Sequence, residues 1–296
     1  MPKVNRRNVL SGMTVKGVMR RQVVQLSAAE PLHKAVNHLI KYKCSALLVT
    51  DPQERPCGVV SKTDLMSAYY AGFSVQSPLV DIMSGQILCC DPQDALESAL
   101  QIMSQNGVHR LYVRDTGSQK VSGIIAYSDI VGQLYRFCRD CTRGRRRLNS
   151  NSQEQKIGRA LVKEVMTDKV LSFGVQDPLG TVIEGLAAHA LGAVLIKDQH
   201  MLPAGVISKS DLILAFNHGI MLDASARDIM TTPVCSCNRG DLLINALHQM
   251  LLSDVKRLFV HYPDLNQVVG VLSLSDAARF RSGTCQACTP SRFINS

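Results

Sequence analysis

The chain of 296 residues contains no tryptophan, and aromatic residues make up only 5% of it. It also lacks an uninterrupted apolar run of the roughly 18–20 residues that a membrane-spanning helix requires, so we expect no membrane insertion. The first residues, Met1 to Met13, are basic but contain no apolar core and no small-residue cleavage pattern. We therefore predict no secretory signal and expect a cytoplasmic protein.

Ten cysteines are too few for a disulfide scaffold in a chain of this length, and in a reducing compartment they are thiols or metal ligands. With 46% hydrophobic residues, the chain can form one or two packed domains. Lysine and arginine outnumber aspartate and glutamate by 33 to 24, which gives a formal net charge of +9. This excess favours an anionic partner, which on charge alone is a nucleotide, a nucleic acid or a lipid headgroup.

Four segments share an opening phrase that ends in methionine and a closing phrase that runs from glycine to aspartate. The opening residues are Met19, Met83, Met166 and Met230, and the closing residues are Asp64, Asp129, Asp211 and Asp276. Methionine and aspartate are 45 or 46 residues apart in every segment, and the second half of the chain superposes on the first at a shift of 147 residues. A constant shift of this kind indicates a duplicated pair of repeats.

Each repeat combines a helix of mixed polar and apolar residues with two short apolar runs. In the first repeat the helix is expected at 31–41 and the first run at 46–50, and the later repeats follow the same order. We expect the closing aspartate to cap the helix that follows it, because a carboxylate accepts the free N–H groups of a first turn. One repeat is too small to bury its own apolar faces well, so we expect the repeats to pair.

The β-α-β-β-α order, with methionine at the start and Gly-apolar-apolar-Ser-x-x-Asp at the end, closely resembles the CBS domain, named for cystathionine β-synthase. The resemblance covers about residues 12–137 and 158–283 as two tandem pairs, each similar to a Bateman module. It implies an α/β (α+β) fold with small mixed sheets, in which the two modules pack as a pseudo-twofold disc. The expected divisions are repeats at 12–71, 76–137, 158–218 and 223–283, a basic linker with cysteines at 138–157 and a tail with cysteines at 284–296.

CBS modules bind adenosine-containing ligands in clefts between paired repeats, so the resemblance implies AMP, ADP or ATP as the ligand. In the family the closing Ser/Thr-x-x-Asp directs a hydroxyl to phosphate and the carboxylate to the ribose hydroxyls. This division is chemically reasonable, since a carboxylate accepts two hydroxyl donors and a helix start suits an anion. The matching residues are Ser61, Asp64, Ser208, Asp211, Ser273 and Asp276. Asp129 of the second repeat is also predicted to bind the nucleotide, although Ala126 stands there in place of the serine.

Basic residues also recur at the shift of 147 residues. Lys62 and Lys209 follow the serines of the first and third repeats, while Arg110 and Arg257 lie on strands of the second and fourth. We expect one lysine and one arginine near each cleft, which favours a phosphorylated ligand over an uncharged nucleoside. The alternative is that the aspartates are only helix caps and the basic residues only solvated. Many family members have proline at one strand position, where this chain has Leu48, Tyr112, Leu195 and Phe259.

Paired cysteines follow each module and lie outside the CBS pattern. The motif Cys-x-x-Cys-Thr-x-x-Arg occurs twice, again 147 residues apart, with its cysteines at Cys138, Cys141, Cys285 and Cys288. Two such pairs supply the four ligands of a tetrahedral zinc site or an iron–sulfur cluster, provided that the ends of the two modules meet. A thiol–disulfide switch and the absence of any special role are the alternatives. We interpret the other six cysteines mainly as small buried residues.

Six arginines lie between residues 136 and 147, and we interpret this segment as a solvated linker that faces a partner. Without a helix-turn-helix or an RNA-binding sheet signature, nucleic-acid recognition is disfavoured. No Walker loop or nucleophile–base set is present, so we predict no enzyme. The leading hypothesis is a non-enzymatic regulatory protein that binds adenine nucleotides and signals to an unknown protein target, with a homodimer as one candidate assembly. The alternative is a metal- or redox-responsive protein that uses the cysteine pairs, with the CBS modules as scaffold.

Overall fold

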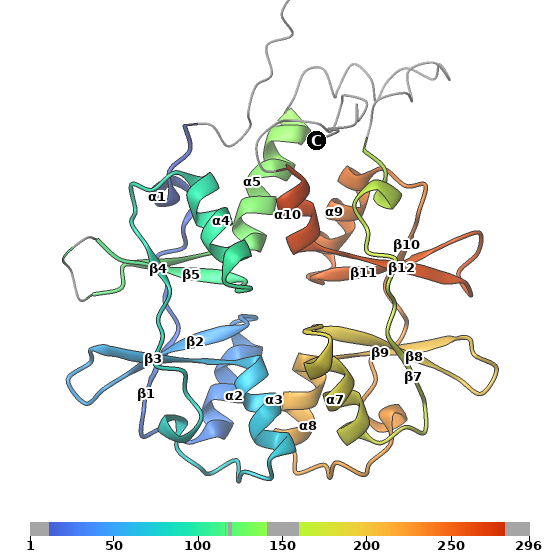
Figure 1. Cartoon of the computed structure of the whole chain (residues 1–296), viewed down its shortest axis with the longest axis horizontal. Coiled ribbons are helices and arrows are strands. Elements are labelled where there is room, and N and C mark those ends of the chain that lie inside the picture. Colours follow the sequence, from blue (N-terminus) through green and yellow to red (C-terminus); the bar gives the residue numbers. More distant parts are fainter. Residues whose placement is uncertain (1–11, 116, 118–119, 141–159, 282–296) are drawn as a thin grey trace, which may run out of the picture.

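The computed structural model describes residues 12–115, 117, 120–140 and 160–281. Figure 1 shows four small sheets with their helices, arranged as the quadrants of a flat disc. Every helix of the described residues is too short or too polar to span a membrane.

The repeats contain the same elements in the same order. The first has α1 (Val15–Val18), β1 (Gln25–Ser27), α2 (Leu32–Lys41), β2 (Ala46–Thr50), β3 (Pro56–Ser61) and α3 (Lys62–Tyr70). The second has η1 (Leu79–Asp81), β4 (Cys89–Cys90), α4 (Leu96–Gln105), β5 (Arg110–Val113), β6 (Gly123–Ala126) and α5 (Tyr127–Asp140). The third has η3 (Val162–Glu164), β7 (Ser172–Gly174), α7 (Leu179–Ala188), β8 (Ala193–Lys197), β9 (Pro203–Ser208) and α8 (Lys209–Asn217). The fourth has η4 (Ala226–Asp228), β10 (Ser236–Asn238), α9 (Leu243–Leu252), β11 (Arg257–His261), β12 (Val268–Ser273) and α10 (Leu274–Arg281).

In each repeat the first strand pairs in parallel with the second, and the second pairs antiparallel with the third. Parallel neighbours need a crossover connection, which α2 supplies in the first repeat. Its buried residues include Leu32, Val36 and Leu39, spaced three or four apart as on one face of a helix. Strand β2 is buried along its whole length because it lies between two other strands.

The prediction that the closing aspartate caps the following helix was wrong. Ser61 is the N-cap of α3, and its hydroxyl oxygen accepts the backbone N–H groups of Thr63 and Asp64. Asp64 is the third residue of the helix, and its Oδ2 accepts the backbone N–H of Ser61 at 2.7 Å. The helix begins earlier than predicted because the serine reaches the first-turn amides, and the carboxylate then points back to the cap. Ser208 and Asp211 form the same capping box at α8.

The methionine and glycine of the repeated phrases meet across the two repeats of a module. A Cβ atom on Gly58 would lie 2.9 Å from Sδ of Met83 and 2.8 Å from the carbonyl oxygen of Ser84. Gly123 faces Met19 in return. In the second module the corresponding pairs are Gly205 with Met230 and Gly270 with Met166. Because each repeat inserts its methionine against the other's glycine, both residues recur at a fixed spacing.

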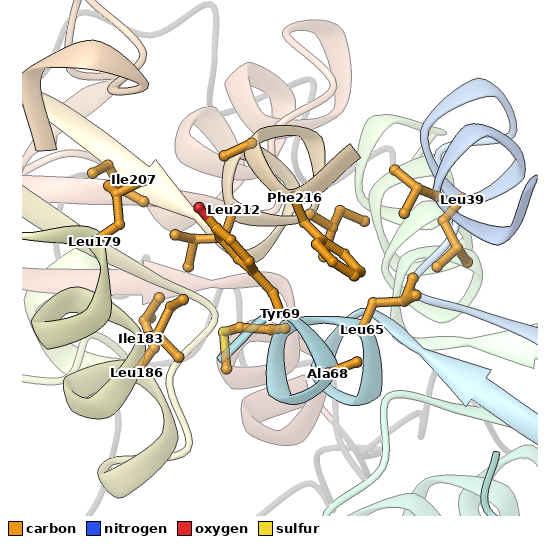
Figure 2. Packing of buried hydrophobic residues seen from close by; sticks show 14 of the residues in the cluster. Leu39, Leu65, Ala68, Tyr69, Leu179, Ile183, Leu186, Ile207, Leu212 and Phe216 are labelled. Carbon is orange, nitrogen blue, oxygen red and sulfur yellow. The ribbon is translucent and has the colours of Figure 1, made fainter. Parts of the chain in front are cut away.

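Two hydrophobic clusters hold the disc together, and each spans both modules. One joins the first and third repeats, where α3 packs on α8. Figure 2 shows Tyr69 and Phe216 near its centre, with their rings stacked 5.2 Å apart between centroids. The other cluster joins the second and fourth repeats, where α5 packs on α10. The first repeat therefore faces the third and the second faces the fourth (Figure 1).

This arrangement confirms the predicted α/β (α+β) fold, in which four β-α-β-β-α repeats form two modules in a disc. The shift of 147 residues relates the capping box at Ser61 to that at Ser208, and relates β2 to β8. Equivalent residues of the two modules therefore face one another where α3 and α8 begin.

Candidate functional site

The predicted serine, lysine and aspartate ligands lie where the last strand of each repeat meets the following helix, and the two arginines begin the middle strands β5 and β11. In all four repeats Oδ2 of the aspartate accepts the backbone N–H of the residue three positions earlier, at 2.7–3.0 Å. The fold therefore uses one oxygen of each carboxylate. What each aspartate can bind is decided by its other oxygen, Oδ1.

The four aspartates differ in what meets Oδ1. Among the described residues, Asp64 has no hydrogen-bond partner at this atom. Oδ1 of Asp211 accepts a hydrogen bond of 3.2 Å from the Thr231 hydroxyl, and Nη2 of Arg279 lies 3.4 Å from Oδ1 of Asp276. Long contacts of this kind are weak and can be exchanged for the hydroxyls of a ribose.

Asp129 already forms an ion pair with an arginine from the other repeat of its module. Nε of Arg20 lies 2.9 Å from Oδ1 of Asp129, whose side chain is 14% exposed. Burial raises the pKa of Asp129, and the guanidinium of Arg20 opposes this rise. Since Ala126 also replaces the serine here, this position lacks both of the groups that the resemblance implies for a nucleotide.

The two arginines link the repeats of their own modules. Arg110 donates to a backbone carbonyl of the first repeat and, at 2.7 Å, to the hydroxyl of Ser45. Arg257 donates to the equivalent carbonyl of the third repeat at 3.4 Å. At the position of Ser45 the second module has Gly192, where a Cβ atom would lie 2.2 Å from Nη2 of Arg257. This glycine makes room for the guanidinium without binding it, so Arg257 is held less firmly than Arg110.

The two lysines reach farther than the sequence predicted. Nζ of Lys62 donates to Oγ of Ser210 at 2.5 Å, and Nζ of Lys209 donates to Oγ1 of Thr63 at 2.8 Å. Each lysine thus contacts the helix start of the opposite module. The sequence had predicted that Lys62 and Lys209 lie in the clefts between the repeats of their own modules.

Two further basic residues join the lysines at the centre of the disc. Lys256 interacts electrostatically with Lys62 and Arg110, and His109 interacts with Lys209 and Arg257. Sequence reasoning missed both, although they directly precede the two arginines and are 147 residues apart. The centre therefore contains two equivalent groups of basic residues, one with a lysine where the other has a histidine.

Crowding by protein atoms and mutual repulsion disfavour the charged forms of these groups. Burial lowers the pKa of Lys62 and of Lys209. The surrounding protein, and then the charges of Lys62 and Arg110, lower the pKa of Lys256 to about 8, although its side chain keeps contact with solvent. The surrounding protein and the neighbouring cations lower the pKa of His109, although its side chain is exposed. A bound anion would relieve this repulsion.

We expect Lys256→Met to be more stable than the native protein at pH 7, with a difference that shrinks as the pH rises through 8. In the folded chain Lys256 loses its proton near pH 8, whereas the unfolded chain keeps it until about 10.4. The unfolded state then binds more protons, so the stability of the native protein rises with pH in this range. Urea unfolding at pH 7, 8 and 9 measures the difference.

Lys16→Met serves as the control for that comparison, because it removes a lysine charge at an exposed position. Comparing variants is necessary because burial raises the pKa of Cys90 and Cys237 to about 12, which lowers the stability of every variant as the pH rises past the ordinary thiol pKa of about 8.5. A difference for Lys256→Met that stays constant from pH 7 to 9 would contradict the prediction.

A small apolar cluster fills the space between the two sheets of the first module, with Leu48, Tyr112 and Ile124 at its centre. The buried hydroxyl of Tyr112 and the buried Nε of Arg110 have no hydrogen-bond partner among the described residues. Burial raises the pKa of Tyr112 to about 12. The guanidinium of Arg110 opposes this rise, so the hydroxyl and the guanidinium interact with each other. The second module has Phe259 in place of Tyr112.

The predicted metal site lies almost entirely outside the described residues, where Cys141, Cys285 and Cys288 fall, and only the backbone of Cys138 is described, in α5. Within the described part of the chain, no group of three or more histidine, cysteine, aspartate or glutamate residues could hold a metal ion. The zinc or iron–sulfur site therefore stays a prediction. The arginine-rich segment at 136–147 likewise has no described side chains.

Comparisons with known proteins agree with this architecture. The family model described as "CBS domain" matches residues 15–71, 79–136, 162–218 and 226–283. The uncharacterized protein MJ1225 of Methanocaldococcus jannaschii is 20% identical over 215 residues, which are 71% of this chain and 73% of the relative. The CBS domain-containing protein YhcV of Bacillus subtilis is 27% identical over 118 residues, which are 40% of this chain and 82% of the relative.

Two solved structures extend over nearly the whole chain. The crystal structure of MJ1225, named there as a candidate archaeal homologue of g-AMPK, has a TM-score of 0.74 at 15% identity and covers 90% of this chain and 99% of its own. An uncharacterized conserved protein from Pyrococcus horikoshii has a TM-score of 0.58 at 15% identity and covers 91% and 100%. At these identities the two structures show a shared fold.

Proposed function

The chain belongs to the CBS domain family, and from this premise we propose that it is a regulatory protein that binds adenine nucleotides between its paired repeats. We assign it no catalytic step, because the groups placed at the ligand bind and orient it. In this proposal a protein partner recognises the change in the disc that nucleotide binding produces.

The observation that supports this function best is the pairing of exchangeable carboxylate oxygens with excess cations. Asp64 and Asp211 each use one oxygen for the capping box and leave the other free or weakly bonded. Lysine and arginine side chains gather beside the same helix starts. A ribose that carries phosphate matches both features, since its hydroxyls donate to the carboxylate and its phosphate accepts from the cations.

The identity of the nucleobase, adenine, is assigned from the family. CBS modules bind adenosine-containing ligands, and the partly exposed apolar residues that pack against the small apolar cluster of the first module, including Val23 and Val59, provide surface against which a purine ring can pack. The cations at the centre then favour AMP, ADP or ATP over adenosine.

The four positions are not equivalent in this proposal. We assign nucleotide binding first to the sites of Asp64 and Asp211, where the carboxylate is least engaged. The site of Asp276 is a third candidate, because its Ser273 is present and its contact with Arg279 is long. Asp129 is held by Arg20 and is not assigned a nucleotide.

Thermal unfolding of the full chain with AMP, ADP, ATP, GTP or adenosine tests the function. A nucleotide at 100 times its dissociation constant should stabilise the folded state by about 2.7 kcal/mol at each site. We expect the adenine nucleotides to raise the unfolding temperature, adenosine to do so more weakly, and GTP to have little effect. Equal responses to ATP and GTP would contradict the assignment of adenine, and no response to any compound would contradict nucleotide binding.

A further inference from the structure

The starting point is the exchange of lysines between the modules. Lys62 is the first residue of α3, yet its ammonium contacts Ser210, the second residue of α8. Lys209 is the first residue of α8, and its ammonium contacts Thr63, the second residue of α3. The two contacts are equivalent under the shift of 147 residues that relates the modules, so the crossing is reciprocal.

The crossing brings each lysine within electrostatic reach of the carboxylate of the opposite module. The charge of Asp211 favours the protonated form of Lys62, and the charge of Asp64 does the same for Lys209. Each ammonium is thus electrostatically linked to the aspartate that we assign to a nucleotide in the other module.

Apart from this attraction, the surroundings disfavour the charge of each ammonium. The first turn of a helix carries partial positive charge from its free N–H groups, and a lysine at this point is repelled. Arg110 adds to the repulsion at Lys62, and Arg257 adds to it at Lys209. In the structure each ammonium donates to a neutral hydroxyl. A phosphate at the helix start would replace that hydroxyl with a charged acceptor and offset the repulsion.

We propose that each of the two main nucleotide sites is completed by a lysine from the other module: Lys62 binds the phosphate at the Asp211 site, and Lys209 binds the phosphate at the Asp64 site. This inference rests on the proposed function. It implies that neither module alone contains a complete site. A nucleotide at either site also contacts both α3 and α8, so its binding acts directly on the interface between the modules.

The experiment isolates each site in the full chain and then removes one lysine at a time. The variant Asp64→Ala, Asp276→Ala retains the Asp211 site, and the variant Asp211→Ala, Asp276→Ala retains the Asp64 site. ATP binding to each is measured by isothermal titration calorimetry, alone and with Lys62→Met or Lys209→Met added. Methionine has a similar length to lysine without its charge.

In the chain that retains the Asp211 site, Lys62→Met should weaken ATP binding at least about tenfold, and Lys209→Met by less than about threefold. In the chain that retains the Asp64 site, the two lysines should exchange roles. Adenosine serves as the matched ligand control, because it has no phosphate and its binding should be insensitive to either lysine. If a methionine variant unfolds at a lower temperature than its parent, the corresponding glutamine variant replaces it.

The failures of the inference and of the function can be told apart. ATP binding that depends on the aspartates but follows the lysine of the same module, or neither lysine, would overturn the crossed assignment and leave the function standing. A native chain that binds no adenine nucleotide would overturn the proposed function and the crossed assignment with it.

Discussion

Replacement of both Asp64 and Asp211 by alanine is expected to abolish most of the stabilisation that ATP gives to the full chain. In the proposed complex each carboxylate accepts the ribose hydroxyls, and hydrogen bonds to a charged group contribute about 1.5–3 kcal/mol each. The loss of two such bonds corresponds to a decrease in affinity of roughly 100-fold or more at each site. Isothermal titration calorimetry with ATP measures the loss directly.

Asp129→Ala is the matched control for this prediction. Asp129 has the same place in its repeat and the same bond to the start of its helix, but Arg20 already occupies its second oxygen. This substitution costs the chain a comparable helix-start interaction and should leave ATP affinity nearly unchanged. Equal losses from Asp129→Ala and from the double variant would show that the aspartates act only through folding. Unchanged affinity in the double variant would remove both residues from the site.

Gly123→Ala is expected to destabilise the folded chain by about 1–3 kcal/mol, the usual cost of inserting a methyl group into a well-packed position. The added Cβ would lie 2.7 Å from the backbone carbonyl oxygen of Arg20 and 3.1 Å from Sδ of Met19. The carbonyl cannot easily move, because it accepts a hydrogen bond of 2.8 Å from the backbone N–H of Ile124. Chemical unfolding monitored by circular dichroism measures the change.

Gly132→Ala provides the comparison for the glycine prediction. Gly132 lies within α5, where a Cβ atom would meet nothing within 4 Å among the described residues. Alanine in a helix interior is favoured over glycine by roughly 0.5–1 kcal/mol, so this variant should be slightly more stable than the native chain. Opposite effects of the two substitutions on the free energy of unfolding would support the contact between the methionine of one repeat and the glycine of the other. Equal effects would mean that the close approach at Gly123 does not matter to stability.

The strands and helices were largely predictable because they depend on residues close in sequence. The apolar run 46–50 coincides with β2, and the helix expected at 31–41 differs from α2 by one residue. The capping box was misread for a related reason. Both Ser61 and Asp64 suit a helix start, and only the backbone geometry shows which residue is the cap and which lies in the first turn.

The candidate site was predictable in its residue types and less so in its contacts. The shift of 147 residues identified Ser61, Asp64 and Lys62 together with their counterparts. It did not reveal that Arg20 pairs with Asp129, because those residues are on different repeats and no local pattern connects them. Lys256 and His109 were missed because no local pattern marks a basic residue beside a strand as part of a site, and only the meeting of four repeats brings these two near the lysines and arginines of the site.

By itself the sequence determined the duplication and the order of elements in each repeat, since these follow from periodicity, turn chemistry and spacing along the chain, and its repeated motifs carried the resemblance to the CBS family. Only the tertiary structure decided which groups share a site. Lysine is long enough to cross from one helix start to another, so the direction of Lys62 and Lys209 depends on how α3 packs against α8. That packing results from the burial of apolar residues that belong to two different modules, and no single repeat contains it.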